Sequence, residues 1–309
     1  MSIPGPDSIA AQSGMPTTTL ATSPQPKTFG WLAAQIAGWK ANPYFKRKVL
    51  SYIGLVMAKD HFSEEIASEY DVTARGVFDN DVLGPAVDRL AEWAEGGPVL
   101  EFGVGTGRVA LPLSERGIEV HGIELSPAMA ARLREKSGGD RIALTLGDFA
   151  LTRIDRTFNL VYLVYNTIMN LTRQDEQVAC FANAAAHLRP GGRFVVEVLV
   201  PDLRRLPPGK TIQPFAVSET HIGFDEYTDL ARQQLTSHHH WPGSERAPVS
   251  TPFRYVWPAE LDLMARLAGM RLDERWSDWQ RSPFTGESAA HVSVWQRSPD
   301  PAASATGPA

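Results

Sequence analysis

The feature that most constrains the fold is a glycine-rich turn between a short apolar run and a segment of helical character. The run Val99–Phe102 contains Glu101 and leads into Gly103, Gly105 and Gly107. Glycines at alternate positions let the backbone turn sharply and pass close to a small molecule, because no Cβ intervenes. The pattern predicts a ligand-binding loop at the end of a first strand.

The spacing of these glycines argues against a dinucleotide site. The fingerprint of that class, Gly-x-Gly-x-x-Gly, requires its third glycine at position 108. That position is Arg108, and the third glycine comes one residue early. A nicotinamide-dependent oxidoreductase is therefore the weaker alternative.

Strand-like and helix-like segments alternate after this turn, as a parallel sheet with crossover helices requires. The turn signal at residues 189–192 is expected to precede the last parallel strand. The predicted fold class is α/β, with a Rossmann-like doubly wound and mostly parallel sheet. We expect its strands at residues 99–102, 118–123, 142–146, 160–165 and 193–200. We expect helices at residues 109–116, 127–135 (with Ser126 as N-cap) and 176–188.

The rest of the chain adds covering elements to this core. Apolar and polar residues alternate in parts of residues 211–256, as they do in β-strands. We therefore expect an antiparallel insert over the active-site edge of the sheet. Residues 270–276 and 291–295 are expected to close the sheet as an antiparallel pair, and helices at 63–69 and 81–94 precede it. The predicted units are 1–27 (disordered), 28–95 (helical extension and lid), 96–202 (ligand-binding core), 203–257 (substrate-capping insert), 258–297 (end of the core sheet) and 298–309 (disordered tail).

Composition excludes several classes of protein. The net charge of −5 argues against a general nucleic-acid surface, and no apolar run approaches the ~20 residues of a membrane helix. The single cysteine, Cys180, excludes an internal disulfide and suits a reducing compartment, so we expect a cytoplasmic protein. Residues 28–60 combine basic and apolar side chains at helical spacing. This segment either packs on its own domain or contacts a partner, an anionic membrane surface or a second copy in a homodimer.

Acidic, aromatic and amide side chains stand where four successive strands end. In open parallel sheets, ligands bind beyond these carboxyl ends, where the strand order reverses. Taken singly, Glu124 is also explained as a helix cap and Asp148 as a turn residue. The residues that share this placement are Glu101, Glu124 with Leu125, Asp148 with Phe149, and Tyr165 with Asn166.

Several motifs together resemble the class I S-adenosylmethionine-dependent methyltransferases. The Glu-x-Gly-x-Gly-x-Gly turn is similar to the first motif of that family, and three later segments are similar to its successive motifs. The resemblance extends from Glu69 to Val200, and more loosely to Trp295. Tyr70-Asp71 and the antiparallel insert resemble the small-molecule branch, which includes the N,N-dimethyltransferases of deoxyamino-sugar biosynthesis and other antibiotic-pathway enzymes. The later segments are Gly-Ile-Glu-Leu-Ser (122–126), Gly-Asp-Phe (147–149) and Leu-Arg-Pro-Gly-Gly-Arg-Phe (188–194).

The resemblance implies S-adenosylmethionine as the cofactor. This compound carries a sulfonium and an ammonium group and no pyrophosphate, so its pocket favours acids over a phosphate cradle. Glu124, 21 residues beyond Gly103, suits the ribose hydroxyls. Asp148 suits the adenine amino group while Phe149 covers the ring, and Tyr70 approaches the methionine end. The remaining expected contacts are Glu101, Gly103, Gly105, Gly107, Leu125 and Tyr165.

Methyl transfer is an in-line displacement at the methyl carbon, for which alignment and desolvation supply ~7–11 kcal/mol. A base is needed only to make the nucleophile available. The candidates for catalysis are Tyr70, Asn166 and His238. A turn-forming role also explains Asn166, and an exposed strand position also explains His238. No metal is expected, since the histidines at 238–240 lack a third ligand at a recognisable spacing.

The sequence therefore predicts a methyltransferase that acts on a small-molecule acceptor. An amine nitrogen is the first expectation, with C-methylation of an electron-rich, indole-like ring or O-methylation as alternatives. The Asn-Pro-Pro-Tyr type of motif that would indicate a nucleobase or protein amide is absent at residues 165–168. Outside catalysis, the alternative is a cofactor-binding protein whose N-terminal segment docks on a partner.

Overall fold

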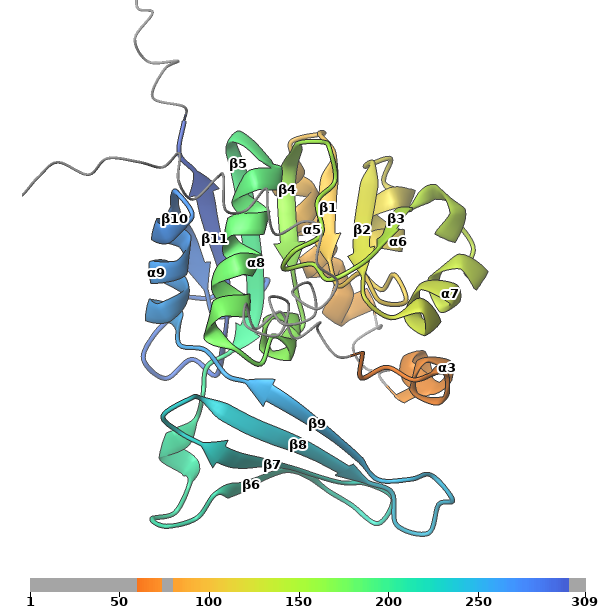
Figure 1. Cartoon of the computed structure of the whole chain (residues 1–309), viewed down its shortest axis with the longest axis vertical. Coiled ribbons are helices and arrows are strands. Elements are labelled where there is room, and N and C mark those ends of the chain that lie inside the picture. The colour runs from red at the N-terminus through yellow and green to blue at the C-terminus, as the bar shows by residue number, and fades with distance from the viewer. Residues whose placement is uncertain (1–59, 74–79, 300–309) are drawn as a thin grey trace, which may run out of the picture. The chain divides into compact units, whose positions relative to one another are not determined.

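Two β-sheets organise the part of the chain that the structure describes (Figure 1). The structure is a computed structural model, and it describes residues 60–73 and 80–299. The predicted disorder of residues 1–27, most of the basic segment 28–60 and nearly all of the predicted tail lie outside the described residues. Within the described ranges, no helix has the length and apolar character that crossing a bilayer requires.

The larger sheet has seven strands. They are β1 (Val99–Phe102), β2 (Val120–Glu124), β3 (Ala143–Leu146), β4 (Phe158–Leu163), β5 (Leu188–Leu199), β10 (Met270–Trp276) and β11 (Ala290–Arg297). Their order is β10-β11-β5-β4-β1-β2-β3, and β1 pairs in parallel with both β2 and β4, so the strand order reverses at β1. β11 runs antiparallel to β5 and to β10. This confirms the predicted doubly wound, mostly parallel sheet closed by an antiparallel pair.

Helices cover both faces of this sheet. The helices that pack on the faces are α5 (Asn80–Ala94), α6 (Ala110–Glu115), α7 (Pro127–Glu135), α8 (Gln174–His187) and α9 (Pro258–Leu267). A further helix, α3 (Glu64–Thr73), lies at the carboxyl edge, and the 3-10 turns are η1 (Gly139–Arg141), η2 (Thr167–Asn170) and η3 (Leu203–Arg205). One buried cluster joins α8 and α9 to the sheet and includes Phe181 and Trp295. A second cluster joins α5, α6 and α7 to the sheet and includes Trp93. Ser126 is the N-cap of α7, as predicted, and accepts a hydrogen bond from the Met129 backbone N–H at 3.4 Å.

Several predicted boundaries differ from the structure, and for two of them the backbone gives the reason. β4 ends before Tyr165 and Asn166, because both residues have positive φ and turn the chain out of the strand. β5 begins earlier than predicted, because Phe158 pairs with Leu188 across a bulge that contains the predicted turn. α3 continues to Thr73 instead of ending at residue 69.

The residues after β5 form a four-stranded antiparallel sheet, as the predicted insert requires. Its strands, in spatial order, are β6 (Ile212–Val217), β7 (Ile222–Asp229), β8 (Gln234–His240) and β9 (Val249–Arg254). The sequence pattern did not separate β6. Figure 1 shows this sheet beyond the carboxyl ends of the parallel strands. Tyr227 and Leu235 from the insert belong to the same buried cluster as α8 and α9.

A buried ion pair fixes the root of the insert to the core. Arg254, at the end of β9, is 3% exposed, and its guanidinium lies 2.7 Å from the carboxylate of Glu260 in α9. The backbone carbonyl of Arg254 accepts a hydrogen bond from the Gln177 amide of α8 at 3.1 Å. A buried charge requires such partners, so they fix where the insert joins the core.

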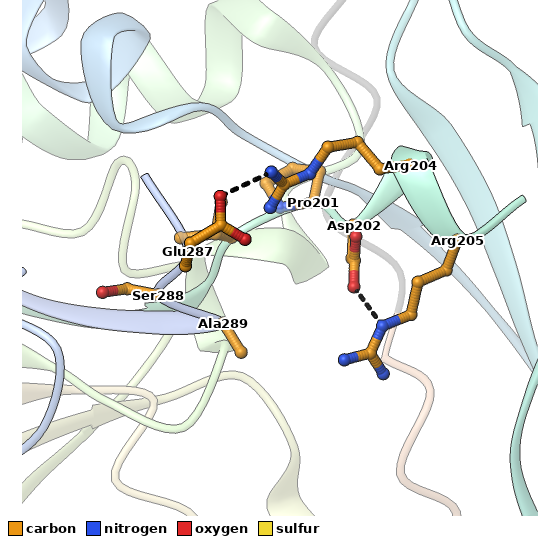
Figure 2. Close-up of a pocket in the computed structure, with 8 residues that line it drawn as sticks. Pro201, Asp202, Arg204, Arg205, Glu287, Ser288 and Ala289 are labelled. Atoms are coloured by element: carbon orange, nitrogen blue, oxygen red, sulfur yellow. Dashed lines mark hydrogen bonds and ion pairs between the residues drawn. The ribbon is translucent and has the colours of Figure 1, made fainter. Parts of the chain in front are cut away.

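A hollow marks the place where the chain leaves β5 for the insert (Figure 2). Arg204 pairs with Glu287 at 3.1 Å, and Arg205 pairs with Asp202 at 2.7 Å. Both arginine side chains are largely exposed to solvent. The hollow therefore presents charges that neutralise each other in pairs.

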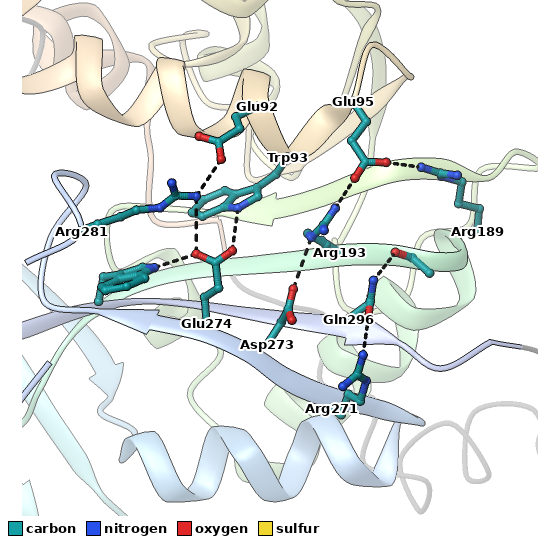
Figure 3. A network of polar contacts seen from close by, with 12 residues as sticks. Glu92, Trp93, Glu95, Arg189, Arg193, Arg271, Asp273, Glu274, Arg281 and Gln296 are labelled. Carbon is teal, nitrogen blue, oxygen red and sulfur yellow. Dashed lines mark hydrogen bonds and ion pairs between the residues drawn. The ribbon is translucent and has the colours of Figure 1, made fainter. Parts of the chain in front are cut away.

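A polar network ties α5 to the antiparallel side of the larger sheet (Figure 3). Glu95, just after α5, accepts hydrogen bonds from Arg189 at 2.9 Å and from Arg193 at 2.7 Å. Arg281 donates to Glu92 in α5 at 2.8 Å. Partly exposed pairs of this kind contribute ~0–1 kcal/mol each, so they orient α5 more than they stabilise the fold.

One carboxyl group is buried within the larger sheet itself. Glu101 in β1 is 4% exposed and accepts a hydrogen bond from the Tyr162 hydroxyl of β4 at 2.9 Å. Burial raises the pKa of Glu101 to about 8. This group is therefore largely protonated at neutral pH.

We expect Glu101→Gln to flatten the pH dependence of stability. In the folded protein the carboxyl keeps its proton up to about pH 8, whereas the unfolded chain releases it near the ordinary pKa of 4.5. Between these values the folded state binds one more proton, so the free energy of unfolding of the wild type falls as the pH rises. Urea unfolding from about pH 5 to pH 8 measures both slopes. Equal slopes would show that Glu101 is ionised in the folded protein.

We expect Gly107→Ala to destabilise the protein more than Gly117→Ala. Both glycines have positive φ, +84° and +80°, which other residues adopt at a cost of roughly 1–2 kcal/mol. A Cβ at Gly107 would also lie 2.3 Å from Leu133 Cδ1, whereas a Cβ at Gly117 meets open space. The free energy of unfolding should fall by about 3 kcal/mol in the first variant and by about 1 kcal/mol in the second. Urea unfolding measures both values, and equal losses would contradict the packing argument.

Candidate functional site

A pocket opens at the carboxyl edge of the larger sheet, beside the point where the strand order reverses. It lies against the ends of β1 and β2, and α3, α7 and η2 border it. Much of the predicted cofactor set lines it: Tyr70, Gly103, Gly105, Glu124, Leu125, Asp148 and Phe149. The sequence analysis missed the other lining residues: Asp60, His61, Phe62, Met129, Thr167, Asn170 and Leu171.

The missed residues differ in whether the sequence carried a signal for them. Thr167, Asn170 and Leu171 follow β4 closely, so their place after a predicted strand was a usable signal. Met129 lies in the first turn of α7, directly after the end of β2. Residues 60–62 precede α3, far along the chain from the glycine turn, and no local pattern indicates that they reach the pocket.

Glu124 links the glycine turn to the start of α7. Its Oε2 accepts the Gly105 backbone N–H and its Oε1 accepts the Ser126 backbone N–H, both at 2.8 Å. The residue is 6% exposed, and burial raises its pKa. A carboxylate has about four acceptor positions, so about two remain for hydroxyl groups of a ligand.

Asp148 and Phe149 form another part of the pocket wall. Asp148 Oδ1 accepts the Ala150 backbone N–H at 2.8 Å, which closes the turn after β3, and burial raises the pKa of this carboxyl. Phe149 stacks on Phe102, with ring centres 5.8 Å apart. The Asp148 carboxylate thus stabilises a turn and still keeps acceptor positions for a ligand.

The three glycines of the turn have different roles. A Cβ at Gly103 would lie 2.8 Å from Thr167 Cγ2, so the glycine allows η2 to approach the turn closely. Gly105 lines the pocket, and its N–H is held by a carboxylate. Gly107 does not line the pocket, and Leu133 occupies the space beside its Cα. Two of the glycines therefore border the pocket and the third serves packing.

α3 and the residues before it cover one side of the pocket, and we call residues 60–73 the lid. The Asp71 carboxylate of α3 accepts a hydrogen bond from Thr106 Oγ1 at 2.6 Å and forms an ion pair with Lys136. Ser126 Oγ donates to the Phe62 carbonyl at 2.9 Å. These contacts join the lid to the glycine turn and to α7.

Tyr70 is held on the lid side of the pocket. Its ring meets Phe62 edge-on, with ring centres 5.9 Å apart. Burial raises the pKa of the Tyr70 hydroxyl to about 12. A phenol with this pKa is protonated at neutral pH, so the arrangement favours hydrogen-bond donation over proton abstraction.

Tyr165 and Asn166 form a turn after β4 and do not line the pocket. Tyr165 is 42% exposed, and the Arg108 guanidinium carbon lies 4.7 Å from its ring centre. Asn166 Oδ1 accepts the Leu199 backbone N–H at 2.8 Å. The Glu197 carboxylate of β5 accepts the Tyr165 backbone N–H at 2.9 Å. The Asn166 side chain therefore serves the turn, which is the alternative that the sequence left open.

Glu101 and His238 also lie away from the pocket wall. Glu101 is committed to its hydrogen bond inside the sheet. His238 lies on the face of β8 that points away from the core, where its Nδ1 is 2.8 Å from Ser250 Oγ and its ring stacks on Phe224 with centres 4.8 Å apart. Of the three predicted catalytic residues, Tyr70 lines the pocket and the other two do not.

The charges around the pocket restrict the ligand that it can hold. Asp60, Glu124 and Asp148 line it, and among the described residues no lysine or arginine does. Such a wall repels a pyrophosphate and favours a cationic ligand. No cluster of three or more metal-ligating side chains occurs in ranges 60–73 and 80–299. The lining residues fit S-adenosylmethionine, which carries a cationic sulfonium and a cationic ammonium group.

Comparisons with known proteins agree with this fit. Residues 99–192 match a family described as a methyltransferase domain. The CcbJ methyltransferase of Streptomyces caelestis is 38% identical, with a TM-score of 0.63, over 69% of this chain and 88% of that chain. The cypemycin N-terminal methyltransferase of a Streptomyces species is 28% identical over 74% of this chain and 98% of its own length. The S-adenosylmethionine-bound amino pentose methyltransferase CalS10 of Micromonospora echinaspora shares the fold at 21% identity, with a TM-score of 0.58, over 74% of this chain and 96% of that chain.

The matched region contains the glycine turn, Glu124 and Asp148. Gly103, Gly105, Glu124 and Asp148 of this region also line the pocket at the point where the strand order reverses. The chain therefore belongs to the S-adenosylmethionine-dependent methyltransferases.

Proposed function

We propose that this methyltransferase modifies an amine nitrogen of a small-molecule acceptor. The observation that carries the proposal is the four-stranded insert, which lies beyond the carboxyl edge at which the cofactor pocket opens. An acceptor has to approach the pocket past this sheet and α3, which suits a small molecule better than a broad protein surface. Two relatives support nitrogen as the target, since one is named an N-terminal methyltransferase and the other an amino pentose methyltransferase.

Within this proposal four pocket residues each have one task toward the cofactor. Glu124 binds the ribose hydroxyls through the acceptor positions that its two backbone bonds leave. Asp148 accepts the adenine amino group, and Phe149 covers the adenine ring. Tyr70, protonated at neutral pH, donates a hydrogen bond near the methionine end.

The protein's own contribution to the reaction is alignment and the exclusion of water, which supply ~7–11 kcal/mol. When bound, S-adenosylmethionine supplies a methyl carbon whose bond to sulfur breaks, with the electron pair going to sulfur, as the nitrogen lone pair forms the new bond and the surplus proton leaves to solvent. The hydrogen bonds of Asp71 and Ser126 hold the lid against the pocket and keep water out. An acceptor that arrives as a neutral amine needs no protein base.

We expect Glu124→Gln to weaken S-adenosylmethionine binding by about 10- to 100-fold, since a neutral amide replaces the carboxylate that accepts the hydroxyl hydrogens. Isothermal titration calorimetry with S-adenosylmethionine and S-adenosylhomocysteine measures the dissociation constants. Glu135→Gln changes an exposed glutamate of α7 and should bind like the wild type. If the Glu124 variant has the wild-type free energy of unfolding and keeps its affinity for S-adenosylmethionine, the ribose is bound elsewhere.

We expect methyl-labelled S-adenosylmethionine to transfer its label to amines. The panel pairs glucosamine with glucose and a free dipeptide with its N-acetylated form, and adds phenol and indole. Mass spectrometry of the products locates the added methyl group. If phenol or indole is methylated and no amine is, the proposed nitrogen target is wrong, and the target is oxygen or carbon. Cofactor binding without transfer to any acceptor would instead favour a non-catalytic binding protein.

A further inference from the structure

The insert carries a transverse row of polar side chains that the proposed function has not used. Gln213 on β6 is in register with Asp225 on β7. Asp225 is in register with Ser237 on β8, and Ser237 is in register with Thr251 on β9. Residues in register point to the same face of a sheet, so these four side chains form one stripe, which we call the polar row.

The polar row faces the core of the protein. Tyr227 and Leu235 stand two positions from Asp225 and Ser237 along the same strands, so they share their face. Tyr227 and Leu235 are 7% and 4% exposed and belong to the main buried cluster. Ser237 is itself 7% exposed. Glu226, the next residue of β7, points to the opposite face.

Two anchors place the polar row near the mouth of the cofactor pocket. At one end of β8, Leu235 belongs to the same buried cluster as Leu171, which lines the pocket, and the neighbouring β9 contacts η2. Beyond the other end of β8, Arg246 forms an ion pair with Glu69 of α3 at 3.2 Å, one residue before Tyr70 on the pocket wall. Figure 1 shows β8 running from the side of the core toward α3. The polar row lies between these anchors and faces the pocket side.

The chemistry of the polar row calls for a ligand with hydrogen-bond donors. Asp225 is half-buried, accepts a hydrogen bond from the Ser237 hydroxyl, and has a pKa raised by burial. Gln213 Oε1 is buried and, within the described part of the chain, accepts no hydrogen bond. Buried acceptors without a donor are costly. A protonated amine supplies several N–H donors together with a positive charge, whereas an indole supplies one N–H donor and no charge.

We propose that the polar row binds the acceptor and that the Asp225 carboxylate accepts a hydrogen bond from an N–H group of it. This inference rests on the proposed function and narrows it. The acceptor class is a basic amine that carries further N–H or O–H donors, as an amino sugar or a peptide amino terminus does. Asp225 is then a specificity residue for the acceptor and has no part in binding the cofactor.

The test compares Asp225→Asn with Glu226→Gln in the full chain. Glu226 is a matched control because it follows Asp225 in β7 but points outward, where its carboxylate lies 3.4 Å from His238. The probe is the amine of the panel above that the wild type methylates best. We expect Asp225→Asn to raise the KM for this amine about tenfold or more and to keep the affinity for S-adenosylmethionine within about twofold. Glu226→Gln should change neither quantity.

A second variant decides the matter if Asp225→Asn fails to fold, as judged by circular dichroism and cofactor binding. Ser237→Ala removes the hydroxyl that donates to Asp225 and should raise the same KM about threefold. If the folded variants have wild-type KM values, the polar row is not the acceptor site. The proposal that the enzyme methylates amines would be unaffected by this result. A wild type that methylates phenol or indole but no amine would overturn the proposed function, and this inference with it.

Discussion

The arrangement of the site depends on the two hydrogen bonds that Glu124 accepts. The N–H of Gly105 comes from the turn after β1 and the N–H of Ser126 from the turn after β2, so one carboxylate holds two loops in a single register. Neither N–H can be left unpaired in a buried place without a cost of about 1–3 kcal/mol. The same carboxylate keeps positions for the ribose hydroxyls, so the bonds that shape the pocket also orient the group proposed to bind the cofactor.

Two covering elements from distant parts of the chain meet around this centre. The lid is held to the glycine turn through Asp71, and the insert is held to the core through Arg254. Arg246 of the insert also pairs with Glu69 of the lid, so the two covers are joined to each other. Burial at this centre raises the pKa of Glu124 and of Asp148. A cationic ligand in the pocket favours the ionised form of both groups, which is why these acids suit S-adenosylmethionine.

A strained turn explains why two residues that the sequence analysis assigned to the site instead have a structural role. Tyr165 and Asn166 both have positive φ, 57° and 61°. This conformation costs residues other than glycine roughly 1–3 kcal/mol each. Glu197 accepts the Tyr165 N–H, Asn166 accepts the Leu199 N–H, and Trp279 donates its indole N–H to Glu197 at 2.7 Å. These bonds compensate the strain and link the end of β4 to β5 and to the last strands of the sheet.

The sequence by itself determined the doubly wound sheet, the N-cap at Ser126 and the pocket positions of Glu124 and Asp148. These features depend on periodicity, turn chemistry and strand ends, all of which are local. Only the tertiary structure decided which of the other candidates reach the site. His238 and Asp225 lie on opposite faces of the insert because strand register sets the direction of each side chain, and residues 60–62 join the pocket through contacts with segments far along the chain. Local pattern contains neither kind of information, because both arise from pairing between distant segments.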